Sequence, residues 1–174
     1  MLLKKLKEIS AQKALKKALN QENSYSKTGN EKIKSFACIL NVDEFNHMEV
    51  FEELAKEIGL RQDQFKIVGF SALNTDMSNY SIPVFSAKDI GWNGTIENGD
   101  INEFLSKEYD LLLNYYETPS LALSLVSIST KAKLRVGIHQ NNEIYNDIIL
   151  KVKASEYLKF KPELIKYLSI LNRI

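Results

Sequence analysis

Short apolar runs alternate along the chain with stretches in which apolar residues recur every three or four positions. The short runs predict strands, and the longer spacing predicts helices. Six strands are expected, at residues 33–42, 65–70, 82–85, 109–116, 133–139 and 145–152. Helices are expected at residues 44–58, 101–107, 119–130 and 154–171, the last with an interruption near Pro162. Because several strands are apolar throughout, helices should cover both faces of a mostly parallel sheet, which predicts a three-layer, Rossmann-like α/β domain.

A basic segment precedes this domain. Residues 1–20 carry apolar side chains at helical spacing, such as Leu2, Leu6 and Ile9, among six lysines. The segment lacks the apolar core of a secretory signal, so we expect an amphipathic basic helix that packs on the domain and leaves its lysines in solvent. The expected organisation is a basic helix with a polar linker at residues 1–30 and the α/β domain at residues 31–174.

Charge is segregated along the chain, although the net charge is only +1. Residues 1–34 hold nine lysines and three acids, a net charge of +6. Residues 35–130 hold five basic and fifteen acidic residues, a net charge of −10, and residues 131–174 hold nine basic and four acidic residues, a net charge of +5. A surface with a basic side and an acidic side is expected if the two ends of the chain meet in space.

The residue counts exclude several kinds of site. The 174 residues include one cysteine and two histidines, so an internal disulfide and a three-histidine metal site are impossible. The seven glycines form neither a phosphate-binding loop nor a dinucleotide fingerprint, and no serine-hydrolase elbow is present. We therefore expect no metal and no cofactor. Cys38 lies in an apolar strand and should be buried and inert, and a reducing, cytoplasmic location is expected.

Polar residues follow the predicted strands, at the edge where an open parallel sheet binds its ligands. The candidate ligand-binding residues are Asn41, Asp43, Trp92, Thr118, Ser120 and His139. Thr118 and Ser120 open a helix whose free N–H groups could hold an anion. Trp92 lies in a glycine-containing loop and could cover a pocket.

Each of these residues also has a structural interpretation. Asn41 or Asp43 could cap the helix that follows the first strand, and Thr118 could cap the helix that begins at Pro119. His139 could be an exposed or structural side chain, and Trp92 could fill the edge of the core. The sequence leaves these alternatives open.

One stretch carries a resemblance to a known family. Residues 109–138 read YDLLLNYYETPSLALSLVSISTKAKLRVGI and end in the run from Ala132 to Gly137 followed by Ile138. This stretch resembles a strand–helix–strand unit in the N-terminal half of heptosyltransferase-type glycosyltransferases. The resemblance implies a catalytic aspartate after the first strand, for which Asp43 is the nearest position, although Val42 replaces the usual preceding glycine. Over more of its length, the chain is similar to short bacterial Rossmann-like proteins known only as a domain of unknown function.

Three functions follow as hypotheses. The first is a binding or interaction module without complete catalytic machinery, whose partner is another protein chain or a small anionic ligand. The second is a glycosyltransferase-like half that acts with a partner chain. The third is binding of nucleic acid or an anionic membrane surface through residues 1–20, where the absence of aromatic residues from residues 1–24 disfavours base stacking.

Overall fold

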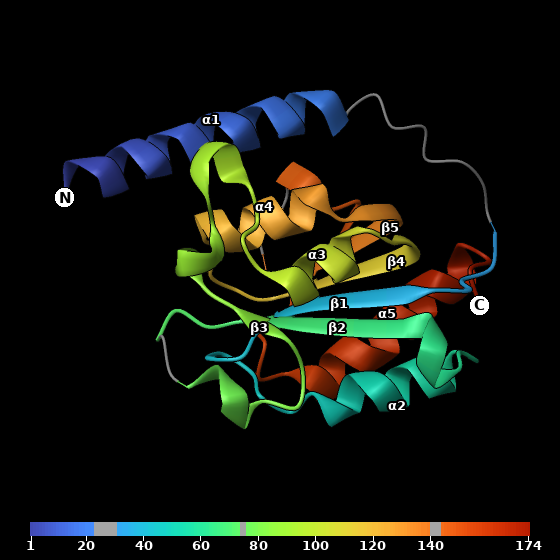
Figure 1. Ribbon diagram of the computed structural model, residues 1–174. Coiled ribbons are helices and arrows are strands. Elements are labelled where there is room, and N and C mark those ends of the chain that lie inside the picture. Colours follow the sequence, from blue (N-terminus) through green and yellow to red (C-terminus); the bar gives the residue numbers. More distant parts are fainter. Residues whose placement is uncertain (23–30, 74–75, 140–143) are drawn as a thin grey trace.

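Six parallel strands form one sheet at the centre of the protein (Figure 1). This computed structural model describes residues 1–22, 31–73, 76–139 and 144–174, apart from the side chain of Glu22. The strands are β1 (Phe36–Asn41), β2 (Phe65–Phe70), β3 (Val84–Phe85), β4 (Glu108–Tyr115), β5 (Lys131–Ile138) and β6 (Ile148–Leu150). Their order is β3-β2-β1-β4-β5-β6, and every adjacent pair is parallel. The predicted Rossmann-like α/β class is confirmed.

Helices cover both faces of the sheet, as the apolar strands predicted. One face is covered by α2 (Glu49–Glu57) and α5 (Tyr157–Ile170), and the other by α3 (Gly99–Leu105) and α4 (Leu121–Ser129) (Figure 1). A further helix, α1 (Leu2–Glu22), lies outside α4. The protein therefore has the three expected layers and, beyond them, an added helix.

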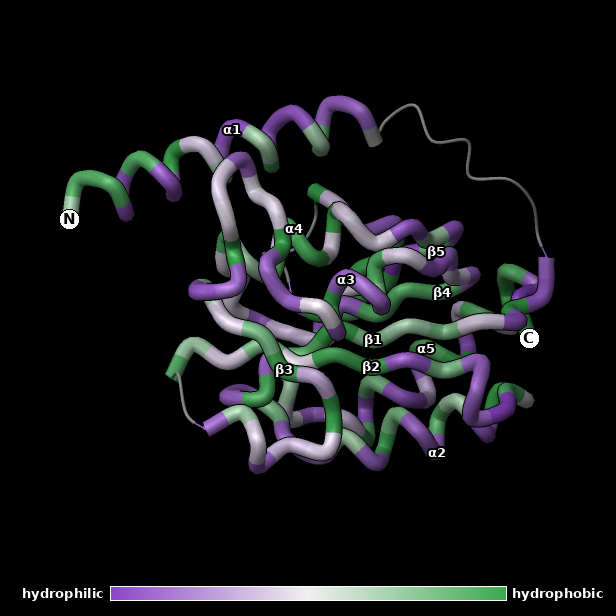
Figure 2. The backbone as a smooth tube through the Cα atoms, viewed as in Figure 1, coloured by the Kyte–Doolittle hydropathy of each residue, from purple (hydrophilic) through white to green (hydrophobic). Residues whose placement is uncertain are grey.

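The central strand β1 shows why the sequence lacks alternation. Phe36, Cys38 and Leu40 pack with α2 and α5, whereas Ala37 and Ile39 pack in the cluster that contains α3 and α4. All six residues of β1 are buried, and Figure 2 shows mainly hydrophobic residues along the central strands. Burial raises the pKa of the Cys38 thiol, which keeps it protonated, as the apolar strand predicted.

The basic helix α1 is docked on the domain. Ala11 is fully buried, and Leu15 and Ala18 are half-buried against the same core cluster. The backbone N–H of Asn93 donates a hydrogen bond to the Ser10 hydroxyl at 3.1 Å. The predicted helix that packs on the domain with solvated lysines is confirmed, and the predicted linker falls mostly on residues 23–30, which lie outside the described residues.

Several predicted boundaries were wrong at helix starts. The predicted helix at residues 44–58 begins only at Glu49, and its N-cap, Met48, makes no side-chain hydrogen bond, so neither Asn41 nor Asp43 caps it. The helix α4 is capped by Ser120, whose hydroxyl accepts a hydrogen bond from the Leu123 N–H, and not by Thr118. Instead of capping a helix, the carboxylates of Asp43 and Glu44 accept hydrogen bonds from the segments that follow β2 and β4.

Two further predictions differ in detail. The helix α5 runs through Pro162 to Ile170, so the expected interruption was wrong. The sixth strand, expected at residues 145–152, is shortened to Ile148–Leu150.

A glycine near the end of β5 makes room for a buried polar contact. Gly137 pairs with Asn114 of β4, and a Cβ atom at Gly137 would lie 2.8 Å from the carboxamide carbon of Asn146. That carboxamide accepts a hydrogen bond from Asn114 Nδ2 at 2.8 Å, and Asn114 Oδ1 accepts one from the Ser127 hydroxyl at 2.9 Å. The glycine therefore permits Asn114, which is fully buried, to be satisfied.

We expect Gly137→Ala to lower the free energy of unfolding by about 1–3 kcal/mol, because the new methyl group would displace Asn146. Urea-induced unfolding of the purified protein measures this change. The matched control is Gly99→Ala, since a Cβ at Gly99 meets no atom within 4 Å. Equal stability of the two variants would contradict this account of Gly137.

Candidate functional site

The carboxyl ends of β1 and β4 mark the point where the strand order reverses. β1 and β4 are adjacent, but the chain leaves β1 towards β2 on one side and leaves β4 towards β5 on the other. In open parallel sheets, ligands bind in the crevice outside these strand ends. Here residues 42–48 follow β1 and residues 116–120 follow β4, and these two segments form the switch point.

The carboxylate of Glu44 joins the two segments of the switch point. Its Oε2 accepts a hydrogen bond from the backbone N–H of Glu117 at 2.7 Å, and its Oε1 accepts one from the N–H of Thr118 at 2.9 Å. Two adjacent backbone N–H groups that point at one carboxylate form the kind of concavity that binds anions. Glu44 therefore occupies the position that an anionic ligand would take beside β4.

The neighbouring Asp43 fills a second set of donors, after β2. Its Oδ1 accepts a hydrogen bond from the Ser71 hydroxyl at 2.8 Å, and its Oδ2 accepts one from the N–H of Ala72 at 2.6 Å and a longer one from Leu73 at 3.4 Å. The Asn41 side chain accepts a hydrogen bond from the Asp43 N–H at 3.0 Å, which fixes the turn that leaves β1. Asp43 and Glu44, although consecutive, therefore accept hydrogen bonds from two different segments, one after β2 and one after β4.

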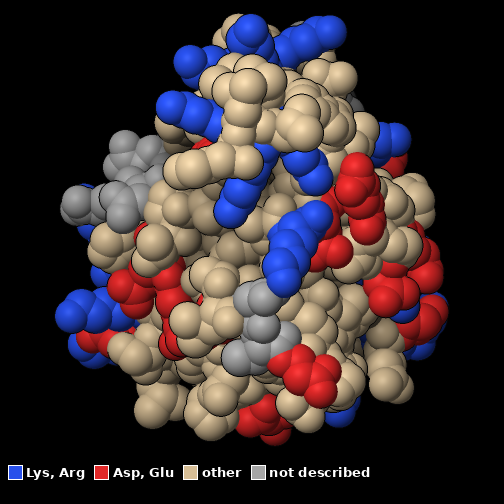
Figure 3. Space-filling model, turned by 60° about the vertical axis from the view of Figure 1, so that its left-hand side comes forward, with Lys and Arg blue, Asp and Glu red and all other residues tan. Residues whose placement is uncertain are grey.

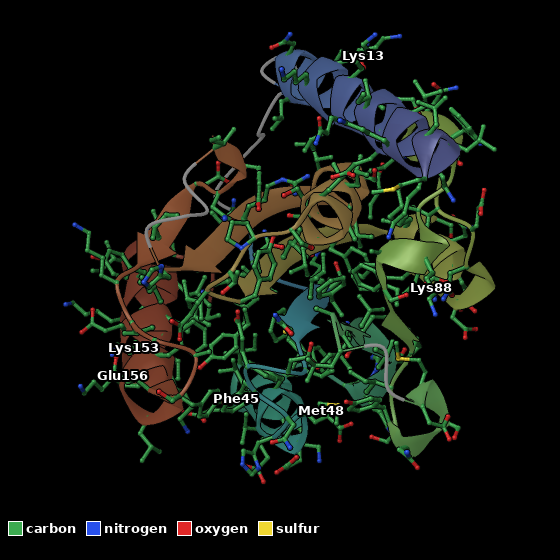
Figure 4. The ribbon with its side chains drawn as sticks, turned by 90° about the vertical axis from the view of Figure 1, so that its left-hand side faces the viewer. Lys13, Phe45, Met48, Lys88, Lys153 and Glu156 are labelled. Carbon is green, nitrogen blue, oxygen red and sulfur yellow. The ribbon has the colours of Figure 1, made fainter. Side chains whose placement is uncertain are left out.

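Aromatic side chains pack beside this turn, between α2 and α5. The ring of Phe45 lies 5.3 Å from Tyr115, 5.8 Å from Phe51 and 6.1 Å from Tyr157, measured between centroids. Figure 4 looks onto this edge of the sheet and shows Phe45 between the two helices. Burial raises the pKa of Tyr115 and Tyr157, so both remain neutral phenols.

Both tyrosine hydroxyls donate hydrogen bonds to backbone carbonyl groups. Tyr115 donates to the Ala154 carbonyl at 2.7 Å, and Tyr157 donates to the Val50 carbonyl at 2.8 Å. The Glu117 carboxylate accepts a hydrogen bond from the N–H of Ala154 at 2.6 Å. These bonds tie the start of α5 to the switch point.

Three of the six candidate residues converge and the others lie apart. Asn41, Asp43 and Thr118 surround the turn that carries Glu44. Thr118 is exposed, and its N–H is already bonded to Glu44. Ser120 is engaged as the cap of α4. Ligand binding by these residues stays a prediction.

His139 follows β5, two strands away from β1. It has a positive φ of 60°, and its N–H donates to the Leu150 carbonyl at 3.1 Å, which joins it to β6. Its Nδ1 is buried and has no hydrogen-bond partner in the part of the chain that the structure describes. The next residues, 140–143, lie outside the described part.

Trp92 lies on the α1 side of the protein. Its side chain is 48% exposed and lines an open groove of about 720 Å³ together with Leu6, Ile9, Lys13 and Lys17 of α1. That Trp92 covers a ligand pocket stays a prediction, and the groove that it lines is bordered by α1 and not by Asp43, Thr118 and His139.

The residues that carry the glycosyltransferase resemblance have structural contacts here. The buried Arg135 side chain donates to the carbonyls of Ser127 and Thr130, at the carboxyl end of α4, where a cation favourably meets the helix dipole. Asp110 lies at the opposite, amino end of β4, where it accepts a hydrogen bond from the Lys34 N–H at 2.8 Å and pairs with Lys133 at 2.9 Å. Both residues stabilise the unit that the motif predicted.

Sequence reasoning did not include Glu44 among the candidate residues. Nothing in local spacing marks it, because its partners lie 73 and 74 positions away. The described residues contain no cluster of three or more histidine, cysteine or acidic side chains able to hold a metal ion. None of the helices in the described ranges has the length and apolar character to cross a bilayer.

We expect Glu44→Gln to lower the free energy of unfolding by about 1–3 kcal/mol, because the amide group cannot accept both hydrogen bonds and carries no charge. Urea-induced unfolding measures the loss. Glu52→Gln is the matched control, since Glu52 lies on the exposed face of α2. If the two variants are equally stable, the carboxylate of Glu44 does not hold the two segments of the switch point together.

A pH dependence is expected from Asp110. Desolvation alone would raise the pKa of its carboxyl group. The hydrogen bond and positive charge of Lys133, together with hydrogen bonds from the Lys34 backbone and the Ser35 hydroxyl, lower this pKa below the ordinary value of 3.8. A lowered folded-state pKa stabilises the fold above the unfolded-state value, and this contribution is lost as the pH falls through the folded-state value. The difference in stability between the wild type and Asp110→Asn should therefore be full at neutral pH and shrink below pH 3.8. Thermal unfolding over a pH series measures it, and a pH-independent difference would contradict the ion pair.

Comparison with known proteins places the chain in a family. No curated protein and no solved structure matches the chain significantly. A family model described as "Family of unknown function (DUF6913)" matches residues 7–171, a span that includes most of α1 and the whole sheet. The protein therefore belongs to this family of unknown function.

Proposed function

We propose that this protein is a binding module that presents a surface to a partner and carries out no reaction at the edge of its sheet. The observation that supports this most directly is the pair of carboxylates at the switch point. Asp43 and Glu44 occupy the backbone N–H groups that would hold an anionic ligand in a fold of this kind.

The carboxylates of Asp43 and Glu44 would compete with an anionic ligand for the same backbone N–H groups. A phosphate or sugar nucleotide would have to displace side chains that are covalently held beside their donors and therefore compete at a high effective concentration. The displaced acids would then lie next to the incoming anion and repel it. Both effects disfavour nucleotide binding at the carboxyl edge.

The α1 side of the protein has the opposite character. Lys13 and Lys17 line the groove beside Trp92. Figure 3 shows mainly basic residues at the top of the protein, where α1 lies, and most of the acidic residues of this view below them. An exposed surface with apolar and basic side chains is typical of an interaction site. We assign the binding function to this side.

A thermal-shift assay tests the proposal. A ligand present at 100 times its Kd stabilises a protein by about 2.7 kcal/mol, which raises the Tm of a chain of this size by several degrees. We expect no such rise with nucleotides, sugar nucleotides or inorganic phosphate. A clear rise, or turnover of a sugar nucleotide with a partner chain present, would overturn the proposal and favour a glycosyltransferase-like activity.

The variant Glu44→Ala makes this assay sharper. It removes the carboxylate and leaves the N–H groups of Glu117 and Thr118 free to donate hydrogen bonds to a bound anion. We expect phosphate to raise the Tm of Glu44→Ala more than that of the wild type. The same response in both proteins would show that Glu44 does not block anion binding at the switch point.

A further inference from the structure

The first turns of α1 expose an apolar stripe. Leu2, Leu6 and Ile9 follow one another at steps of four and three residues, which places them on one face of a helix. Their exposed fractions are 73%, 44% and 39%. Figure 2 shows hydrophobic residues at this end of the helix, where α1 extends past the rest of the protein.

This stripe is not the face with which α1 docks. The buried apolar face that packs on the core consists of Ala11, Leu15, Ala18 and Leu19, and Ser10, between the two faces, accepts a hydrogen bond from Asn93. At about 100° per residue, the two faces lie roughly half a turn apart around the helix axis. Leu6 and Ile9 are partly covered beside Trp92, but the exposed parts of the stripe, and most of Leu2, have no apolar partner among the described residues.

Trp92 and two lysines extend the stripe. Leu6, Ile9 and Trp92 line the same groove, which Lys13 and Lys17 also border. By helix geometry, these lysines continue the face of Leu6 towards the carboxyl end of α1. The resulting α1 surface (Leu2, Leu6, Ile9, Lys13, Lys17 and Trp92) is apolar at one end and basic at the other.

The surrounding charge is mostly positive. The helix α1 has six lysines and only two acids, Glu8 and Glu22. All its lysines except Lys7 are exposed, and Lys7 lies 3.9 Å from Glu97. Figure 3 shows lysine side chains gathered at the top of the protein, where α1 lies. The surface therefore complements an anionic partner.

We infer that the α1 surface binds the surface of an anionic lipid bilayer, an inference that rests on the binding function proposed above. Leucine and isoleucine side chains would enter the boundary between headgroups and acyl chains, and Trp92 would lie at headgroup depth, which tryptophan prefers. Lysines near anionic headgroups each strengthen binding about fivefold. The bilayer offers both environments to one face at once.

Other partners match fewer of these features. A nucleic acid would engage the lysines but leave the stripe of Leu2, Leu6 and Ile9 in water. A second copy of the chain, paired through α1 in parallel, would place Lys13 against Lys13, and antiparallel pairing would place lysines against the leucines. A lipid surface satisfies the apolar and basic ends together.

The protein carries its own reporter for the test, because Trp92 is the only tryptophan in the sequence. Emission spectra are recorded on addition of vesicles that contain phosphatidylglycerol or of vesicles of phosphatidylcholine alone, and co-sedimentation measures the bound fraction. We expect a blue shift and co-sedimentation with the anionic vesicles, both reduced by salt. No response to anionic vesicles, or equal binding to both kinds, overturns the inference.

Variants locate the surface. Leu6→Glu with Ile9→Glu should weaken binding at least about tenfold through lost apolar burial, and Lys13→Gln with Lys17→Gln should weaken it about 25-fold through the loss of two charges. Leu158→Glu is the matched control, because Leu158 is an exposed leucine (87%) on α5 and should bind like the wild type. Circular dichroism confirms that each variant is folded. Undiminished binding by either double variant contradicts the assignment.

Two parallel measurements separate the remaining outcomes. Tighter binding to an oligonucleotide than to vesicles, or a dimer in size-exclusion chromatography that Leu6→Glu dissociates, would overturn the lipid assignment in favour of that partner. The thermal-shift assay with nucleotides tests the carboxyl edge of the sheet and not the α1 surface. Absence of both a vesicle response and a nucleotide shift would therefore reject the lipid partner and leave the proposed binding function standing.

Discussion

The hydrogen bonds from the Glu117 and Thr118 N–H groups to Glu44 join the two halves of the sheet at its carboxyl edge. Backbone N–H groups at the ends of strands require acceptors, and in an open parallel sheet a ligand often supplies them. Here the chain supplies its own acceptor. The turn after β1, the start of α4 and the docking of α5 through Glu117 all depend on this arrangement.

A second buried network supports the same region from inside the sheet. Asn114 is held between Asn146 and Ser127, and Arg135 binds the carbonyls at the end of α4. The buried hydroxyls of Tyr116 and Tyr145 lie 3.1 Å apart. Because buried polar groups are costly when unpaired, such a network specifies one packing of α4 against β4 and β5. This requirement explains the arginine and glycine of the motif without invoking a reaction.

The two sides of the protein therefore differ in what they offer to a partner. The carboxyl edge is filled by acids and aromatic rings that already have partners, whereas the α1 surface combines exposed apolar side chains with lysines. Asp43 and Glu44 also leave negative charge at the edge, which disfavours anions there, while the basic α1 attracts them. This contrast underlies the assignment of binding to α1.

Apolar spacing along the chain was enough to predict the α/β class, the burial of β1 and the docked basic helix, because it reports which faces of an element avoid water. Three-dimensional packing was needed to show the strand order, the start of α2 at Glu49 and the reach of Glu44 to residues more than seventy positions away. It also separated Trp92 from Asp43 and placed it beside α1. Spacing contains no information about which distant N–H group a carboxylate will meet, since that depends on how the strands assemble.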